Sequence, residues 1–578
     1  MVQKSLVLAL GCLLVAFVGL RLPAQSFVRV SGGSGLSTEA PVAANDAKSV
    51  DQIIDRVIAR EHEELQMLTT YRRVAETYVQ ELKPNRKEPL TLWRDYYYLG
   101  VTGPSKNPVD YHSMLLPKDQ LPKQGFSDDN FIPQGFLEMA YVDRRDFDRR
   151  HYRFQYAGRE FLGDVRCLVF EVTPLPKSGK ARFLGRIWVE DQSYTVVRFN
   201  GSLSPIHEGP NYHCHFDSWR TNVKPGVWVP AVAFAEETNL KVQKVFSRYF
   251  RFRAQTRFWG YGQKITGRQQ EFSDLTIDAP TPFRDDAADQ DRDKSPVQAE
   301  REWKRQAQGY VLEAMERASL LSPPGEIDKL LNTVVNNLEV TNNLDLEPEV
   351  QCRVLTTSNL DSFTVGNTIV ISRGLLDVLP DEATLAAVLA QELGAILVAN
   401  SSPDQYGFAD TIQIPPLRMF NRFSFKSSHL DQEEASNRAL ALLEKSPYRD
   451  KLSNAGLFLK QISSDSTILR ALVDPHLGDG VYLASRIMNS APPLQVTDRQ
   501  QIAALPLGGR LKLDPWTGGV ELLEVKPVVL ASYREKMPLE LAPFMPYLTR
   551  CKSEAETTKV QGVALFENQS ASSSHADR

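Results

Sequence analysis

Short runs in which apolar and polar residues alternate fill the chain from about residue 90 to residue 278. Clear examples are residues 167–172, 183–189 and 194–199, and the polar residues 190–193 join the second run to the third. A period of two places successive side chains on opposite faces of a strand, and short polar connections join antiparallel neighbours. The pattern therefore predicts an antiparallel β-rich domain at 90–280, with one apolar face that a helix, a ligand or a partner must cover.

Composition narrows the class of the whole chain. Its 578 residues include 67 Lys and Arg against 71 Asp and Glu, giving a net charge of −4, and 42% of them are hydrophobic. These values are ordinary for globular proteins and argue against a disordered chain or a multi-span membrane protein. A dedicated nucleic-acid binder usually has a strong basic excess, so we expect no nucleic-acid partner.

The segments outside the β-rich domain complete an α+β chain. Helical spacing of apolar residues precedes this domain, a charged stretch follows it, and helical patterns then alternate with strands. The predicted segments are a signal peptide at 1–24, an amphipathic helical segment at 46–89, a charged linker at 281–297, an α+β domain at 298–480, a β-containing extension at 481–550, and a polar, mostly disordered tail at 551–578.

The first residues of the chain favour export. Lys4 precedes an apolar run at residues 6–20, and Leu22-Pro23-Ala24 is similar to the sites at which signal peptides are cleaved. A membrane-spanning helix needs about 20 apolar residues, so cleavage near Gln25 is favoured over a retained anchor. We expect the mature protein in the periplasm or cell envelope of a Gram-negative-type bacterium.

Four cysteines remain after such a cleavage, namely Cys167, Cys214, Cys352 and Cys551. Cysteines of exported proteins tend to pair. The first two lie in strand-like segments of the first half, and the other two flank the second half. We therefore expect one disulfide within each half, with buried free thiols as the alternative.

Two charged patterns are interpreted as solvent-facing. Arginines alternate with phenylalanines between Arg248 and Phe258, which is superficially like a platform for single-stranded nucleic acid but is also typical of a strand with one solvated face. Residues 61–65, Glu-His-Glu-Glu-Leu, are followed by Gln66 where a second metal-binding histidine would be required. We interpret them as the solvated face of the first helix.

The most informative motif lies at residues 365–396, VGNTIVISRGLLDVLPDEATLAAVLAQELGAI. Together with residues 362–364 it predicts a hairpin with a tight Gly-Asn turn, and a helix that begins after Pro380. That helix carries Gln391 and Glu392.

This segment resembles the active-site region of metallopeptidase family 48, and the resemblance extends over roughly residues 325–470. It implies a zincin-like fold in which one helix carries His-Glu-x-x-His and a later helix supplies a third zinc ligand. The zinc-ligand positions of the family correspond here to Gln391, Ala395 and Gln432, and its general base corresponds to Glu392. The resemblance also implies a peptide-binding edge strand made of Leu360, Asp361, Ser362, Phe363 and Thr364.

The zinc-ligand positions have lost their donor groups. Two histidines four residues apart on one helix face can present two imidazole nitrogens to one Zn²⁺, but the Gln391 amide is a weak neutral ligand and Ala395 has no donor atom. Gln432 lacks the carboxylate of the third ligand. Glu392 is then a remnant general base, because without a metal it has no water of lowered pKa to activate. We expect no cofactor.

Three functions remain open. The first is a non-catalytic pseudopeptidase that holds an extended peptide or an envelope protein by strand addition. The second is an active zinc metalloendopeptidase with a non-standard site, in which zinc is the cofactor and His429 is a conceivable ligand. In the third, the β-rich half carries a lipid or a lipoprotein and the second half is a scaffold. Residues 165–201 resemble the LolA-type lipoprotein-carrier fold, which implies this function.

Overall fold

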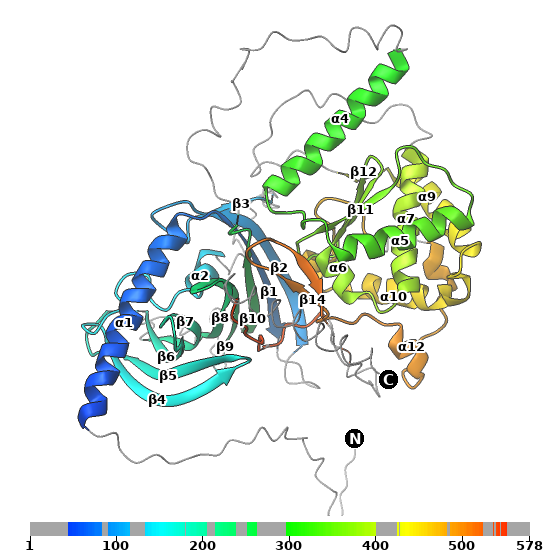
Figure 1. Cartoon of the computed structure of the whole chain (residues 1–578). Coiled ribbons are helices and arrows are strands. Elements are labelled where there is room, and N and C mark those ends of the chain that lie inside the picture. The colour runs from blue at the N-terminus through cyan, green and yellow to red at the C-terminus, as the bar shows by residue number, and fades with distance from the viewer. Residues whose placement is uncertain are drawn as a thin grey trace, which may run out of the picture. The chain divides into compact units, whose positions relative to one another are not determined.

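The computed structural model describes a large part of the chain, and its elements are drawn in Figure 1. The described residues are 44–83, 91–115, 133–179, 181–204, 214–237, 251–262, 296–399, 425–426, 428–481, 486–523, 536, 539–543 and 545–551. The chain divides into two compact units, Met1–Asp51 and Gln52–Arg578. The predicted signal peptide, most of the charged linker and all but the first residue of the polar tail lie outside the described residues.

The first half forms one antiparallel sheet of ten strands, which confirms the predicted β-rich fold and the α+β class of the chain. The strands follow one another as neighbours from β4 to β10, and β10 then pairs with β1, whose other neighbour is β2. Their bounds are β1 Arg73–Lys83, β2 Thr91–Thr102, β3 Tyr111–Ser113, β4 Tyr152–Leu162, β5 Val165–Pro174, β6 Arg182–Glu190, β7 Val196–Ser204, β8 Cys214–Lys224, β9 Val227–Glu237 and β10 Arg251–Trp259.

The first helix is shorter than the sequence pattern predicts. Helix α1 covers Ala44–Thr69, and the chain then enters β1, although a helical segment was expected up to residue 89. Val74 and Tyr78 lie on the same face of β1, and every residue from Arg73 to Leu82 is buried, as in a strand that is covered on both faces. The segment becomes a strand because it satisfies its backbone groups in two antiparallel ladders, with β2 and with β10.

Residues 52–69 of α1 and the short helix α2, Pro133–Glu138, lie over one face of the sheet, here called the inner face. Its side chains include an aromatic cluster of Phe183, Phe199 and Phe216, whose ring centroids are 5.9–6.1 Å apart. All three are buried. The predicted apolar face therefore exists, and segments of the same chain contribute to its cover.

The opposite, outer face of β1, β2 and β10 packs on the second half of the chain. Val74, Tyr78, Tyr97 and Trp259 belong to the same hydrophobic core as the helices of that half. This packing corrects the prediction of a solvated arginine row in β10. Arg257 is half-buried, its Nη1 donates to Ser358 Oγ at 3.5 Å, and burial lowers its pKa to about 10 with a further contribution from Arg373.

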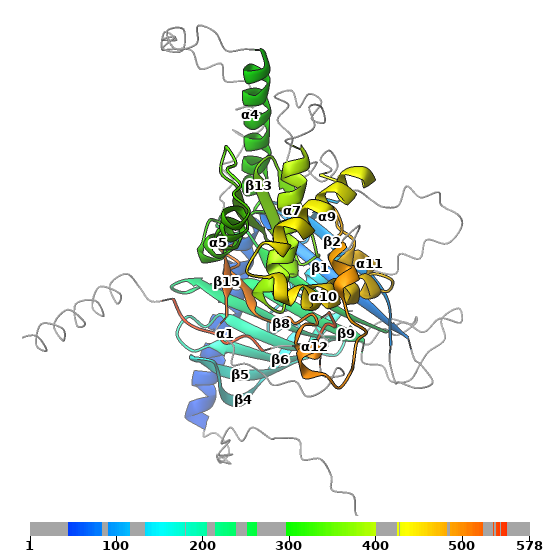
Figure 2. The same ribbon diagram turned by 90° about the vertical axis from the view of Figure 1, so that its right-hand side faces the viewer.

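The second half is α+β, and Figure 2 shows its helices around a small sheet. The sheet order is β11-β13-β12, with β11 parallel and β12 antiparallel to β13. The bounds are α4 Pro296–Arg317, α5 Glu326–Thr341, β11 Gln351–Leu355, β12 Ser362–Val365, β13 Thr368–Ser372, α6 Arg373–Val378, α7 Glu382–Ala399, α9 His429–Glu444, η3 Arg449–Lys451, α10 Leu452–Asp465, α11 Arg470–Val473, η4 Arg486–Ser490, α12 Arg499–Ala503, β14 Leu511–Leu513 and β15 Val520–Leu522.

The predicted hairpin and helix around the motif are present as β12, β13 and α7. Gly366 makes the turn between the strands with φ +60°, a conformation that glycine adopts without strain. Among the described helices, α7 alone has the length and apolar composition of a membrane span, and 72% of its most apolar stretch is buried inside the protein, as expected of a core helix.

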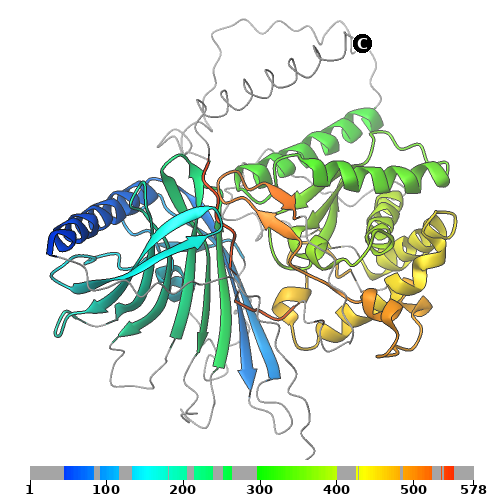
Figure 3. The same cartoon turned by 60° about the horizontal axis from the view of Figure 1, so that its bottom comes forward.

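The end of the described chain returns to the β-rich half and crosses the outer face of the sheet (Figure 3). Gln80 of β1 donates to the carbonyl of Leu539 at 2.5 Å and accepts from the amide of Leu541 at 2.8 Å. Leu548 packs in the core cluster that contains Trp219 and Trp228. We call residues 539–551 the C-terminal strap.

The four described cysteines are free, which corrects the prediction of one disulfide in each half. Cys352 is buried in β11, whereas the amide of Cys551 binds the side chain of Asn222 at the β8–β9 hairpin. Cys551 therefore lies in the first half, at the end of the strap. Its pairing with Cys352 rested only on the positions of the two residues in the sequence.

Candidate functional site

The positions that correspond to a zinc site come together on two packed helices. Gln391, Glu392 and Ala395 lie on α7, and Gln432 lies in the first turn of α9. The helices approach closely at Gly394, where an added Cβ would be 2.4 Å from the carbonyl oxygen of Ala435. Glycine at this position is therefore required by the packing.

Glu392 is buried and bonded to the strand next to it. Ser362 Oγ donates to Glu392 Oε1 at 2.6 Å. Burial raises the pKa of Glu392 to about 7, the hydrogen bond from Ser362 opposes the rise, and the nearby carboxylates of Asp479 and Asp361 add to it. Near neutral pH this carboxyl group is thus balanced between its charged and neutral forms.

Residues 476–479 lie directly against this site. Asp361 accepts hydrogen bonds from the amides of Leu477 and Gly478, both at 2.9 Å, and burial raises its pKa to about 6. Asp479 accepts from Gln432 Nε2 at 2.8 Å and forms an antiparallel bridge with Ser362. The third zinc-ligand position is therefore held in an amide–carboxylate hydrogen bond.

The predicted peptide-binding strand is largely covered by the chain itself. Leu360 and Asp361 are each 0% exposed, Ser362 is 1% and Phe363 is 2% exposed, and only Thr364 is half-buried. The ring of Phe363 stacks on Phe425 with centroids 4.7 Å apart, and the amide of Phe425 binds the carbonyl of Leu477. The chain thus contributes its own cover over this edge.

The side chains at this site do not fit zinc. The Gln391 side-chain oxygen is buried and has no hydrogen-bond partner among the described residues, Ala395 offers no donor atom, and Gln432 is bound to Asp479. Of the histidines, His429 is exposed at the start of α9, and His476 stacks on Tyr97 with centroids 5.1 Å apart. Within the described ranges, no group of three or more His, Cys, Asp or Glu side chains is arranged to hold a metal ion.

A second concentration of buried charge lies between α1 and the inner face of the sheet. Arg220 of β8 binds Glu61 through Nη1 at 2.8 Å and Nη2 at 2.5 Å, and Nη1 also binds Glu64 at 2.9 Å. Arg220 is 1%, Glu61 is 5% and Glu64 is 6% exposed. We call these three residues the inner triad. The burial of Glu61 and Glu64 corrects the prediction of a solvated helix face at these two positions, whereas His62 and Glu63 of the same segment are exposed as predicted.

The inner triad carries two carboxylates on one guanidinium. Burial raises the pKa of Glu64 to about 8, and Arg220 opposes the rise. In the described part of the chain, Glu64 Oε1 and Arg220 Nε have no hydrogen-bond partner. The guanidinium of Arg60 donates a hydrogen bond to the carbonyl of Gly226 at 2.6 Å. The guanidinium of Arg73 donates to the carbonyls of Leu68 and Pro108.

The sequence contains a signal for the inner triad that the interpretation of residues 61–65 as a solvated face overlooks. Ile54, Val57 and Leu68 share a helix face with Glu61 and Glu64, because the five residues are spaced three or four apart. The three apolar members are buried. Two carboxylates within an apolar stripe predict a buried cation on the opposing element.

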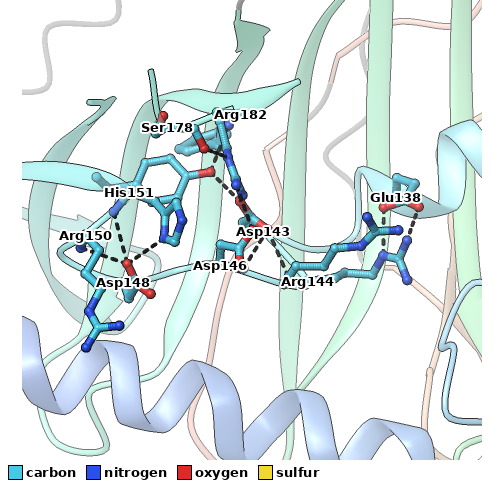
Figure 4. A network of polar contacts seen from close by, with 12 residues as sticks. Glu138, Asp143, Arg144, Asp146, Asp148, Arg150, His151, Ser178 and Arg182 are labelled. Atoms are coloured by element: carbon cyan, nitrogen blue, oxygen red, sulfur yellow. Dashed lines mark hydrogen bonds and ion pairs between the residues drawn. The ribbon is translucent and has the colours of Figure 1, made fainter. Parts of the chain in front are cut away.

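The loop after α2 is attached to the sheet by a separate polar network (Figure 4). Arg182 of β6 donates to Asp143 and Asp146, both at 2.7 Å, and Arg144 pairs with Glu138 at the end of α2. These partners are mostly half-buried or exposed, and each of these carboxylates is matched by a donor. The network anchors α2, so it is structural.

Comparisons with known proteins find similarity only at the level of structure. No family model and no curated protein matches the chain. The β-rich part is similar to a DUF1329 family protein from Desulfovibrio piger, at 14% identity over 39% of this chain and 98% of the other, with a TM-score of 0.20.

Two further solved structures are similar to the β-rich part. One is a putative outer membrane lipoprotein-sorting protein domain from Vibrio parahaemolyticus, at 12% identity over 37% of this chain and 96% of that one, with a TM-score of 0.19. The other is a LolA superfamily protein from Nitrosomonas europaea, at 13% identity over 34% and 90%, with a TM-score of 0.18.

Proposed function

We propose that this protein is a non-catalytic carrier of the cell envelope. The inner face of its β-rich half binds the acyl chains of a lipid or a lipoprotein beneath α1. The second half is a scaffold that holds the outer face of the sheet. The observation that carries the proposal is the inner triad, because it buries an ion pair beside the apolar residues with which α1 covers the sheet.

A buried ion pair contributes little net free energy to the packing of a helix on a sheet. The desolvation of the charges offsets most of their attraction, so apolar residues of the same size would hold α1 more tightly. The two polar atoms of the triad that have no partner among the described residues add to the cost of the closed state. An acyl chain that enters beneath α1 gains the apolar contact with Phe183, Phe199 and Phe216 and leaves the two-point contact of Glu61 with Arg220 in place.

The scaffold role is supported by contacts on the outer face. Glu76 of β1 accepts hydrogen bonds from the amide of Ser358 and the hydroxyl of Tyr97, both at 2.6 Å. Asp95 of β2 accepts from the amides of Ala471 and Leu472 at 2.9 Å. Because these contacts hold the outer face in place, the inner face is the one from which a covering segment can move.

Acyl-chain binding is tested with the purified full-length protein. Native mass spectrometry and lipid extraction should find co-purified lipid, and a fluorescent fatty acid should bind with about one equivalent per chain. Substituting Phe199 by Asp should abolish binding, whereas the same change at the exposed Phe161 of β4 should not. A protein that carries no lipid and binds no fluorescent acyl chain would refute the proposal.

A peptide-binding pseudopeptidase is the second candidate. It is favoured by one observation, the retention of Glu392 on a helix packed against the edge strand β12, as in the zinc-peptidase arrangement implied by the resemblance. This function requires residues 476–479 to release Ser362 so that a peptide can pair with β12. This function would be supported if the amides of Ser362–Thr364 exchange hydrogen in the protein without peptide and exchange more slowly when a peptide is added.

An active zinc endopeptidase with a non-standard site makes a different prediction. The purified protein would contain zinc and digest casein, and a chelator or Glu392→Gln would abolish the activity. Metal analysis of the same preparation used for lipid extraction compares the enzyme and carrier functions directly.

A further inference from the structure

The inner triad already has the geometry of a carboxylate receptor. The guanidinium of Arg220 grips both oxygens of Glu61, and this two-point contact is the strongest that an arginine makes with a carboxylate. Arg220 lies in β8, within an extended sheet, and its aliphatic and guanidinium atoms are buried. A ligand carboxylate would therefore meet a cation whose direction is fixed in advance.

One of the two internal carboxylates is held less firmly than the other. Glu64 makes a single contact with Arg220, while its second oxygen has no hydrogen-bond partner among the described residues. Burial raises its pKa to about 8, so near neutral pH it readily takes up a proton and loses its attraction to Arg220. Glu64 can thus leave the guanidinium at a lower cost than Glu61.

The surroundings of Arg220 suit the remainder of an amphiphile. Its guanidinium lies 5.9 Å from the ring centroid of Phe199, which belongs to the inner aromatic cluster. Another buried cation, Arg73, already donates to two backbone carbonyls and to the hydroxyl of Tyr141. Arg220 is therefore the better placed of the two, next to the apolar surface, to exchange one carboxylate for another.

We infer that Arg220 binds the carboxylate of the ligand in place of Glu64, and that the ligand is a long-chain monocarboxylic acid, with its alkyl chain on Phe199 and the neighbouring aromatic rings. This inference rests on the proposed carrier function and specifies its substrate class. It predicts that a fatty acid binds more tightly than an uncharged molecule with the same chain.

The experiment compares palmitate, methyl palmitate and hexadecanol by displacement of a fluorescent fatty acid from the full-length protein. Palmitate should bind at least about tenfold more tightly than the ester and the alcohol, since the charge-assisted contact with the guanidinium is lost with either. Equal affinities for the three ligands would overturn the inference while leaving the carrier function standing. If none of the three binds, the carrier function fails as well.

Two variants assign the preference to the triad. Glu64→Gln should tighten palmitate binding several-fold and leave methyl palmitate unchanged, because it removes an internal competitor and keeps the shape of the side chain. Arg220→Gln should abolish the preference for palmitate. Arg186→Gln, which removes an exposed arginine paired with Glu171, is the matched control and should behave as wild type. Weaker palmitate binding by Glu64→Gln would contradict the exchange, even if Arg220→Gln failed to fold.

Discussion

Two of the places in which the molecule buries carboxylates differ in what surrounds the charge. In the second half, Glu392 has a serine hydroxyl and two other carboxylates as neighbours, and its pKa rises to about 7. Under α1, Glu61 and Glu64 share the guanidinium of Arg220. In the zinc-peptidase arrangement that the sequence motif suggested, a zinc ion would lie beside Glu392, whereas an internal cation compensates Glu61 and Glu64. Four sets of substitutions probe these two regions, by changing the compensation or the packing that surrounds it, and their expected effects decrease from the first to the last.

Arg220→Met should have the largest effect on stability. It leaves Glu61 and Glu64 buried without their cation, and removing one partner of a buried pair typically costs about 3–5 kcal/mol. Urea denaturation at pH 7 should therefore show a marked loss of free energy of unfolding. Arg186→Met is the control, since its ion pair is exposed and worth less than about 1 kcal/mol. Similar losses of free energy of unfolding in the two variants would show that the inner triad does not stabilise the packing of α1 on the sheet.

Glu392→Gln should stabilise the protein at pH 8. Because the pKa of Glu392 is raised from 4.5 to about 7 in the folded state, the contribution of Glu392 to the free energy of unfolding falls as pH increases between these values and is constant above them. The neutral amide removes this loss, worth up to about 3 kcal/mol, and still accepts the hydrogen bond from Ser362. Urea titrations at pH 4 and pH 8 measure the difference in free energy of unfolding between the variant and wild type. The variant should match wild type at pH 4, and a uniform offset at both values would indicate a change in packing instead.

The triple variant Gln391→His, Ala395→His and Gln432→Glu should create a zinc site, because α7 and α9 already place these positions together with Glu392. Zinc at about 100 times the dissociation constant should then add about 2.7 kcal/mol to the free energy of unfolding. Metal analysis should find one zinc per chain. Each single variant lacks two ligands and serves as a control. A triple variant that folds but takes up no zinc would show that the resemblance to family 48 is misaligned.

Gly394→Ala should destabilise the second half by about 1–3 kcal/mol, since the added methyl group meets the backbone of Ala435. The matched control is Gly309→Ala in α4, where an added Cβ has open space. Thermal unfolding of both variants compares the two. If Gly394→Ala is neutral, then α7 and α9 do not need their close approach.

The sequence predicted the sheet and the motif hairpin because both depend on local pattern. Alternation and turns identify strands without reference to distant residues, as for β12, the Gly366 turn and β13. Burial of charged residues depends on what packs against them. Neither Arg257 nor Glu61 has its partner nearby in the sequence, because Ser358 contacts the first across 101 residues and Arg220 contacts the second across 159. The same reason explains the covered edge strand, because residues 476–479 reach Asp361 only in the folded chain.

The C-terminal strap has a consequence for biosynthesis. Gln80 in the first strand makes hydrogen bonds with Leu539 and Leu541, which are synthesised 459 and 461 residues later. At roughly 5–20 residues per second, translation needs roughly 20–90 s to supply them. During that interval a nascent β-rich domain displays an uncovered face to chaperones. A premature stop codon near residue 538 should therefore destabilise the β-rich domain, although all ten of its strands are still encoded.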